Sequence, residues 1–376
     1  MGPAAMKDGG EPVRAELPCA AVEPADASLL SQLGGWLLAL LIGAAGSVVF
    51  VYAHFPLPWF LGALSFCLIA SVLNAPILRP KPLTIPMRAV LGVAVGSAFS
   101  PALLGRVGGM AGSLAILVPF MVLIIVVSLV FYERVAGFDR PTAFFSAVPG
   151  GLTDMTAMAE DAGANQRAVI LVQATRILIV VFTLPLWLQW HDGLPIGAAA
   201  GSRLRLADIS PFDALVLLSI GWGGWWGARR LGLAGAPIVG PMIVSGILHA
   251  SGVTSAKVPL EVLTFAQISV GVLLGCQFRG LTMKEFTGTM IWGIANTIVL
   301  LAITAVVVVG VSRITGFDPV SVLLAFAPGG QTELNLLAFI MGLDVAYVAL
   351  HHLVRLAVVI IGAQIVFRTR TDWRKL

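Results

Sequence analysis

The chain has 376 residues, of which 58% are hydrophobic and 11% charged, and its mean hydropathy is +0.95. Soluble domains carry about a quarter of charged residues, so this composition excludes an ordinary soluble fold and predicts an all-α polytopic membrane protein. The formal net charge of +4 comes from scattered Lys and Arg residues, a pattern typical of positive-inside topology signals and not of a nucleic-acid-binding surface.

Polar segments divide the chain into two membrane regions. Residues 1–33 are polar and lack a basic stretch followed by an apolar core, so we expect a disordered tail and no cleaved signal peptide. The first membrane region then covers 34–190 and the second 212–367, joined by a polar linker at 191–211 that is rich in Gly and Ala. Residues 368–376 are expected to form a basic cytoplasmic tail.

Each membrane region contains six apolar segments that are expected to be helical. In the first region they lie near 34–53, 58–74, 86–104, 108–132, 141–160 and 167–190. In the second region they lie near 212–228, 236–251, 260–280, 286–312, 319–341 and 345–367.

The two membrane regions are internal repeats of one another. "GFDRPTAFFSAVPGGLTD" (137–154) aligns without a gap with "GFDPVSVLLAFAPGGQTE" (316–333), at an offset of 179 residues. The same offset places the pair Gly92 and Gly96 on Gly271 and Gly275. Each half is therefore predicted to be a homologous repeat of about five to six helical segments.

The number of full membrane crossings decides how the two repeats are oriented. Six crossings each would make the repeats parallel, whereas one re-entrant segment would make them inverted. Counting Lys and Arg on each side separates the two arrangements by one residue only. Arg229 and Arg230 favour inversion, because the corresponding loop 52–57 has no basic residue. We therefore predict inverted repeats and leave the parallel arrangement open.

Both repeats contain a Pro-Gly-Gly sequence inside an apolar segment. Pro149 and Pro328 lack an N–H, and the glycines after them have no side chain to pack, so the helix is predicted to break there and to restart near Thr153 and Thr332. The restart places a carboxylate, Asp154 or Glu333, in the first turn of a half-helix, where the helix dipole stabilises it. The carbonyls left free before each break could coordinate a cation.

Each repeat also carries an arginine near the middle of its last segment, Arg176 or Arg355. A charged side chain inside a membrane is costly, so each is expected to be paired or to face water. His351 and His352 precede Arg355 by four and three residues and can both neighbour it on one helix. A second interpretation is that the Asp–Arg and Glu–Arg pairs are structural locks that hold the broken helices.

Other conspicuous residues are expected to be structural. Asp139 and Asp318 each precede a helix with Pro in its first turn, which is typical of N-caps. The Gly-x-x-x-Gly pairs are expected to let helices approach closely. Cys19, Cys67 and Cys276 have neither disulfide-framework nor zinc-site spacing, so no metal site is predicted.

The duplicated "PGGLTD" and "PGGQTE" segments, each followed by a helix with a central Arg, resemble the AbrB-duplication membrane protein family. The resemblance covers nearly the whole chain from about residue 34. The family is similar to the cation:proton antiporter and bile-acid symporter group, whose members use inverted repeats with broken, crossing helices. The resemblance thus implies inverted repeats here too.

Members of this family are often labelled transcriptional regulators or ammonia monooxygenases. Neither label agrees with the residues, because no His cluster has the spacing of a metal-dependent oxygenase and no basic soluble module is present for DNA. An indirect effect on gene expression stays open, since a transporter can change the level of an inducer.

The function predicted from the sequence is secondary, ion-coupled transport of a small solute across the bacterial inner membrane by a multi-pass protein that is not an enzyme. The alternative is a membrane-embedded regulator or sensor that transports nothing. No cofactor is expected beyond bound Na⁺ or H⁺, and the expected partners are the lipid bilayer and a small-molecule substrate, with a homodimer left open and no nucleic acid. The predicted substrate- and ion-binding residues are Pro149, Gly150, Gly151, Thr153, Asp154, Arg176, Pro328, Gly329, Gly330, Gln331, Thr332, Glu333, Asn335, His351, His352 and Arg355.

Overall fold

The protein is an all-α membrane protein. The computed structural model describes residues 29–101, 107–150, 155, 158–160, 162–192, 204–233, 235–280 and 283–369, and these residues contain helices and loops but no β-strand. Five of the described helices are long and apolar enough to cross a membrane, namely Leu29–Tyr52, Gly108–Arg134, Gln166–Trp190, Leu260–Phe278 and Gly288–Thr315. The predicted fold class is confirmed.

The helices follow the apolar segments predicted from the sequence, except that α1 begins at Leu29, so the prediction of a disordered tail is wrong for residues 29–33. Those of the first half are α1 (Leu29–Tyr52), α2 (Pro58–Val72), α3 (Thr84–Gly96), α5 (Val107–Arg134), α6 (Arg140–Ala147) and α8 (Gln166–Asp192). Those of the second half are α9 (Pro211–Arg230), α10 (Ala236–Ala250), α11 (Leu260–Gly275), α12 (Met283–Thr315), α13 (Pro319–Phe326), α14 (Gln331–Ile340) and α15 (Val345–Thr369).

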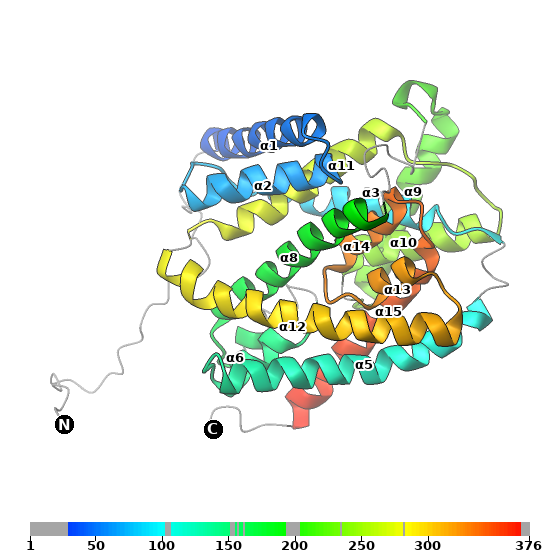
Figure 1. Ribbon diagram of the computed structural model, residues 1–376. Coiled ribbons are helices and arrows are strands. Elements are labelled where there is room, and N and C mark those ends of the chain that lie inside the picture. The colour runs from blue at the N-terminus through cyan, green and yellow to red at the C-terminus, as the bar shows by residue number, and fades with distance from the viewer. Residues whose placement is uncertain are drawn as a thin grey trace, which may run out of the picture.

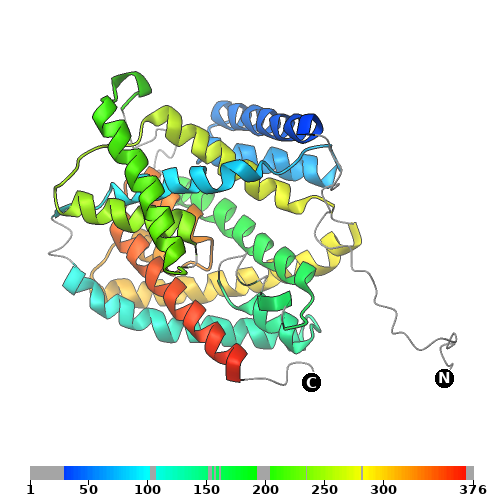
Figure 2. The ribbon, with the colours of Figure 1, turned by 180° about the vertical axis from the view of Figure 1, so that it is seen from behind.

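Corresponding helices of the two halves make reciprocal contacts. The helix α1 packs on α2 and α9 packs on α10, while α2 also contacts α11 and α3 contacts α10. In Figures 1 and 2 these helices lie on one side of the molecule, and the long helices α5 and α12 lie side by side on the other. The bounds of α6 and α13 agree exactly after the shift of 179 residues, as 319 − 140 and 326 − 147 show. The orientation of the halves in a bilayer stays a prediction.

Glycines make the reciprocal helix contacts close. A Cβ added to Gly96 on α3 would lie 2.5 Å from the Met242 carbonyl oxygen of α10. A Cβ added to Gly271 on α11 would likewise lie 2.5 Å from the Phe60 carbonyl oxygen of α2. Backbone cannot give way as a flexible side chain can, so only glycine fits. The packing role predicted for the Gly-x-x-x-Gly pairs is confirmed.

Alanine at these glycines should destabilise the protein. We expect Gly96→Ala and Gly271→Ala each to lower the free energy of unfolding by about 1–3 kcal/mol through overpacking. Gly223→Ala on α9 is the matched control, because a Cβ there meets no atom within 4 Å. Thermal unfolding of the purified protein in detergent, followed by tryptophan fluorescence, measures the difference. Equal unfolding temperatures for all three variants would show that the two crossings are not close.

The aspartates that precede the broken segments, Asp139 and Asp318, are helix N-caps in both halves. The Asp139 carboxylate accepts a hydrogen bond from Thr142 N at 3.2 Å, and the Asp318 carboxylate accepts one from Ser321 N at 2.8 Å. In each helix Pro stands in the first turn, where its missing N–H costs nothing. The capping prediction is confirmed.

The fold brings two cysteines together that the sequence keeps far apart. Cys67 on α2 and Cys276 directly after α11 are both buried free thiols. Both belong to one buried cluster at the α2–α11 contact, and Cys67 Sγ donates to Ala39 O at 3.3 Å. The spacing of the two residues in the chain contains no sign of this pair.

The thiol pair provides a chemical test of the α2–α11 contact. In a Cys19→Ser background, oxidation with copper phenanthroline should join Cys67 to Cys276 within one chain, so that neither thiol reacts with maleimide after unfolding. In the Cys67→Ser variant the remaining thiol should stay reactive after the same treatment. Two reactive thiols after oxidation of the parent chain would contradict the contact. The readout is the mass of the maleimide-labelled protein.

Candidate functional site

The helix breaks at Pro-Gly in both halves. The helix α13 ends at Phe326 and α14 begins at Gln331, and in the first half α6 ends at Ala147, two residues before Pro149. Equivalent turns follow in the two halves, since Gly150 N donates to Val148 O and Gly329 N donates to Ala327 O, both at 2.9 Å. Because proline cannot donate to the preceding turn, the chain leaves the helix here as predicted.

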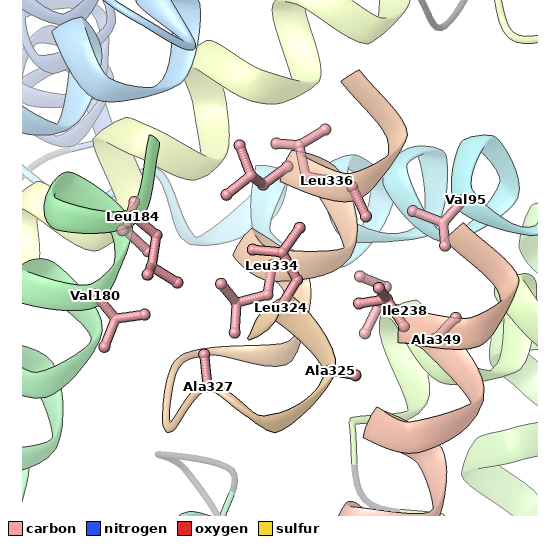
Figure 3. Close-up of a cluster of buried hydrophobic side chains, with 14 of the residues drawn as sticks. Val95, Val180, Leu184, Ile238, Leu324, Ala325, Ala327, Leu334, Leu336 and Ala349 are labelled. Carbon is pink, nitrogen blue, oxygen red and sulfur yellow. The ribbon is translucent and has the colours of Figure 1, made fainter. Parts of the chain in front are cut away.

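The α13–α14 break is partly buried, since Pro328 is buried while Gly329 and Gly330 are partly exposed. Figure 3 shows apolar side chains from several other helices around α13 and α14. These side chains are all buried, and they are Val95 of α3, Val180 and Leu184 of α8, Ile238 of α10 and Ala349 of α15. Irregular backbone at membrane depth needs such cover, because lipid cannot satisfy its polar groups.

Side chains of α15 form hydrogen bonds with the backbone carbonyls at the break. The guanidinium of Arg355 donates from Nη1 to Ala327 O at 2.8 Å and from Nη2 to Gly329 O at 2.9 Å. His352 Nε2 lies 3.0 Å from Leu324 O, near the end of α13. The expectation that these carbonyls are free for a cation is therefore wrong for Ala327 and Gly329, which already accept from a positive charge.

Glu333 is the acidic residue of the second break. It stands in the first turn of α14, as predicted, and its side chain is 9% exposed. Burial disfavours a negative charge on this carboxyl group, and the helix N-terminus together with the charges of Arg88 and Arg355 offsets that effect only in part.

Gly330 and Arg88 complete the surroundings of Glu333. The Glu333 carboxylate folds back against Gly330, where an added Cβ would push it aside. Arg88 lies in α3, a helix that packs against α14. Sequence reasoning missed it, because an Arg at the start of an apolar segment is typical of a membrane-interface charge. Its position opposite the break follows from the packing of α3 alone.

The remaining polar residues of the second half line α14 and α15. Asn335 is fully buried, and its Nδ2 lies 3.8 Å from Met242 Sδ while its Oδ1 has no hydrogen-bond partner. His351 is fully buried too, but it turns to Tyr347 O and to the Ser113 hydroxyl at 2.8 and 2.9 Å. Of the two predicted neighbours of Arg355, His352 therefore lies at the break, where the charge of Arg355 acts on it. Gln331 and Thr332, in the first turn of α14, are only partly buried.

The first half repeats only part of this arrangement. Gln173 donates to Phe145 O at 2.8 Å, and these two residues correspond to His352 and Leu324. Arg176, which corresponds to Arg355, is 4% exposed, and its Nε and Nη1 have no hydrogen-bond partner. Of the other residues predicted here, Pro149 and Gly150 lie at the break, whereas Gly151, Thr153 and Asp154 lie outside the described residues.

No metal site accompanies these residues in the part of the chain that the structure describes. The described residues contain no group of three or more His, Cys, Asp or Glu side chains placed to hold a metal ion. The site is thus a helix break held by arginine, with a buried carboxyl group beside it.

Comparisons with known proteins find relatives of similar length. It is 27% identical over 358 residues to "Uncharacterized protein YhjN" of Bacillus subtilis (strain 168), a match that covers 89% of this chain and 92% of the relative. It is 23% identical over 328 residues to "Putative regulator AbrB" of Escherichia coli (strain K12), covering 85% and 92%. The sequence profile of the family described as "Transition state regulatory protein AbrB" matches residues 59–370. The chain therefore belongs to the AbrB family, as the repeated Pro-Gly-Gly segments predict.

Proposed function

We propose that this protein is a secondary transporter in the bacterial inner membrane, in which a small solute moves with or against H⁺ or Na⁺. The observation that carries the proposal is Glu333, a carboxyl group buried in the first turn of a broken membrane helix. Intramembrane acidic residues are costly and mark ion or proton pathways. Broken helices are the usual place of substrate and coupling-ion sites in secondary transporters.

A purely structural lock explains the same residues less well. A lock would be an ion pair between Glu333 and Arg355, yet Arg355 places two of its nitrogens on backbone carbonyls at 2.8 and 2.9 Å. The arginine thus stabilises the break itself, and the carboxyl group is left to exchange its proton or to bind a cation. Inverted repeats that rock against each other would supply alternating access.

Gradient-driven uptake tests the proposal. Purified full-length protein is placed in proteoliposomes with an imposed pH or Na⁺ gradient and a defined mixture of small organic anions, amines and sugars outside. Mass spectrometry of the lumen should find at least one solute accumulated above its external concentration only when a gradient is imposed. Accumulation of none of them under either gradient would rule out coupled transport of these solute classes and remove the support for the proposal.

The second candidate is a membrane-embedded regulator, which the printed name of the Escherichia coli relative favours. It would act through a partner protein and would transport nothing. Under this reading a Glu333→Gln variant keeps any regulatory phenotype, whereas the transport reading predicts its loss whenever that phenotype depends on an imported or exported solute.

A further inference from the structure

Polar side chains gather between α5, α8 and α12. We call these residues the Arg176 cluster: Ser128 and Tyr132 of α5, Arg176 of α8 and Asn296 of α12. All four are buried, with exposed fractions between 0% and 4%. The contact between α8 and α12 is close here, since a Cβ on Gly293 of α12 would lie 3.3 Å from the Thr175 side chain.

The hydrogen bonds within the cluster leave donors unused. The Asn296 amide nitrogen donates to the Ser128 hydroxyl oxygen at 3.1 Å, and the Tyr132 hydroxyl lies close to the same amide group. Because the Ser128 hydroxyl oxygen accepts from the amide, its own hydrogen is left to donate. Arg176 adds Nε and Nη1, neither of which has a hydrogen-bond partner. Buried donors without partners are costly, so a group that accepts from them is expected.

The positive charge of Arg176 also favours a negatively charged ligand. A guanidinium does not lose its proton in a protein, so Arg176 stays positive at membrane depth. The charge of Arg355 also acts on it, and like charges repel. A negative ligand beside Arg176 would offset this repulsion.

The comparison with Arg355 shows why Arg176 is the ligand-binding member of the pair. Arg355 gives Nη1 and Nη2 to Ala327 O and Gly329 O. The carbonyls at the same places in the first half belong to Val148 and Gly150, and Arg176 makes neither bond. The two arginines align in the sequence. Among the described residues, Arg355 uses its guanidinium on the break, whereas Nε and Nη1 of Arg176 are left to bind a ligand.

We propose that the Arg176 cluster binds a small carboxylate, and that this carboxylate is the transported solute. The claim that this carboxylate is transported rests on the proposed function, whereas the claim that it binds does not. Oxygen anions match charge-assisted donation from a guanidinium and from hydroxyl groups. A carboxylate carries its charge on two oxygens and loses less hydration on burial than a phosphate dianion. The free acceptors of the cluster, such as Asn296 Oδ1, suit a hydroxyl on the same molecule.

Equilibrium binding to the detergent-purified full-length protein tests the site. Radiolabelled formate, acetate, succinate and citrate are the carboxylate probes, and inorganic phosphate and methylammonium are the competitors. At least one carboxylate should bind, and Arg176→Gln should weaken that binding at least about 30-fold, the loss expected when one member of a buried charge pair is removed. Arg167→Gln on the same helix, whose side chain is exposed and bonds Gly280 O, is the matched control and should bind normally.

The site would be overturned if none of the four carboxylates bound, if phosphate or methylammonium bound more tightly than the carboxylates, or if Arg176→Gln bound the carboxylate with unchanged affinity. Unfolding temperatures of both variants show that the fold is intact, and the Arg176→Gln value should not fall, because Nε and Nη1 of Arg176 have no hydrogen-bond partner to lose in the part of the chain that the structure describes. Asp154→Asn should leave carboxylate binding in place. If it lowers the unfolding temperature while no carboxylate binds the parent protein, Arg176 is the partner of Asp154 and the proposal fails.

The binding assay needs no ion gradient. If carboxylate binding depended on Arg176 but no gradient-driven uptake occurred, the proposed transport would therefore be refuted and the proposed binding site would stand. Gradient-driven uptake of an amine or a sugar, without carboxylate binding, would refute the site and leave the transport.

Discussion

Glu333→Gln is expected to abolish the coupling of solute uptake to the ion gradient. A one-unit pH gradient supplies about 1.4 kcal/mol per proton, which supports roughly tenfold accumulation of a solute coupled to one proton. Without a carboxyl group that can exchange its proton, the ratio of internal to external solute should fall from about ten to about one. For Na⁺ coupling the same loss follows, because an amide cannot supply the negative charge.

The substitution is designed to leave the fold unchanged. Gln has the shape of Glu, and Glu333 makes no ion pair within hydrogen-bonding distance in the part of the chain that the structure describes. The unfolding temperature should therefore not fall. Glu261→Gln is the matched control, because Glu261 also stands in the first turn of a helix but is exposed, where its carboxylate accepts from Leu206 N at 2.8 Å. Full gradient-driven accumulation by Glu333→Gln proteoliposomes would show that this carboxyl group does not carry the ion.

Arg355→Met is expected to destabilise the protein strongly, whereas Arg176→Met is not. Removing the Arg355 guanidinium takes two charge-assisted hydrogen bonds from the break, although Ala327 O keeps the Gly329 N–H as a donor. A hydrogen bond to a charged group contributes about 1.5–3 kcal/mol, so the loss should be roughly 3–6 kcal/mol. Gly329 is partly exposed, so water that reaches its carbonyl would bring the loss toward the lower value.

The same substitution in the first half removes no hydrogen bond from Nε or Nη1 of Arg176. It also removes a buried charge, and replacing buried charges by apolar side chains is often neutral or stabilising. Thermal unfolding in detergent should therefore show a large decrease for Arg355→Met and none for Arg176→Met. Equal decreases would mean that Arg176 holds its own break as Arg355 does, which would also remove the basis of the carboxylate site.

The helices and their breaks could be predicted from the sequence, because local properties determine them. Apolar length places the helices, a proline without an N–H ends them, and the Asp carboxylates before α6 and α13 cap the next turn. Each of these effects acts within a few residues of the chain. The position of Glu333 in the first turn of α14 also follows from local order, since the break precedes it directly.

The partners of the site residues could not be predicted, because they come from helices far apart in the chain. Arg88 acts on Glu333 only because α3 packs against α14, and Cys67 meets Cys276 only because α2 crosses α11. Arg176 and Arg355 are equivalent in the sequence, yet one guanidinium binds the backbone of its break and the other keeps unused donors beside Tyr132. The sequence by itself determined that this is a twice-broken helical membrane protein. Only the packing of the helices decided which arginine holds a break and which is available, because hydrogen bonds depend on distances that aligned residues need not share.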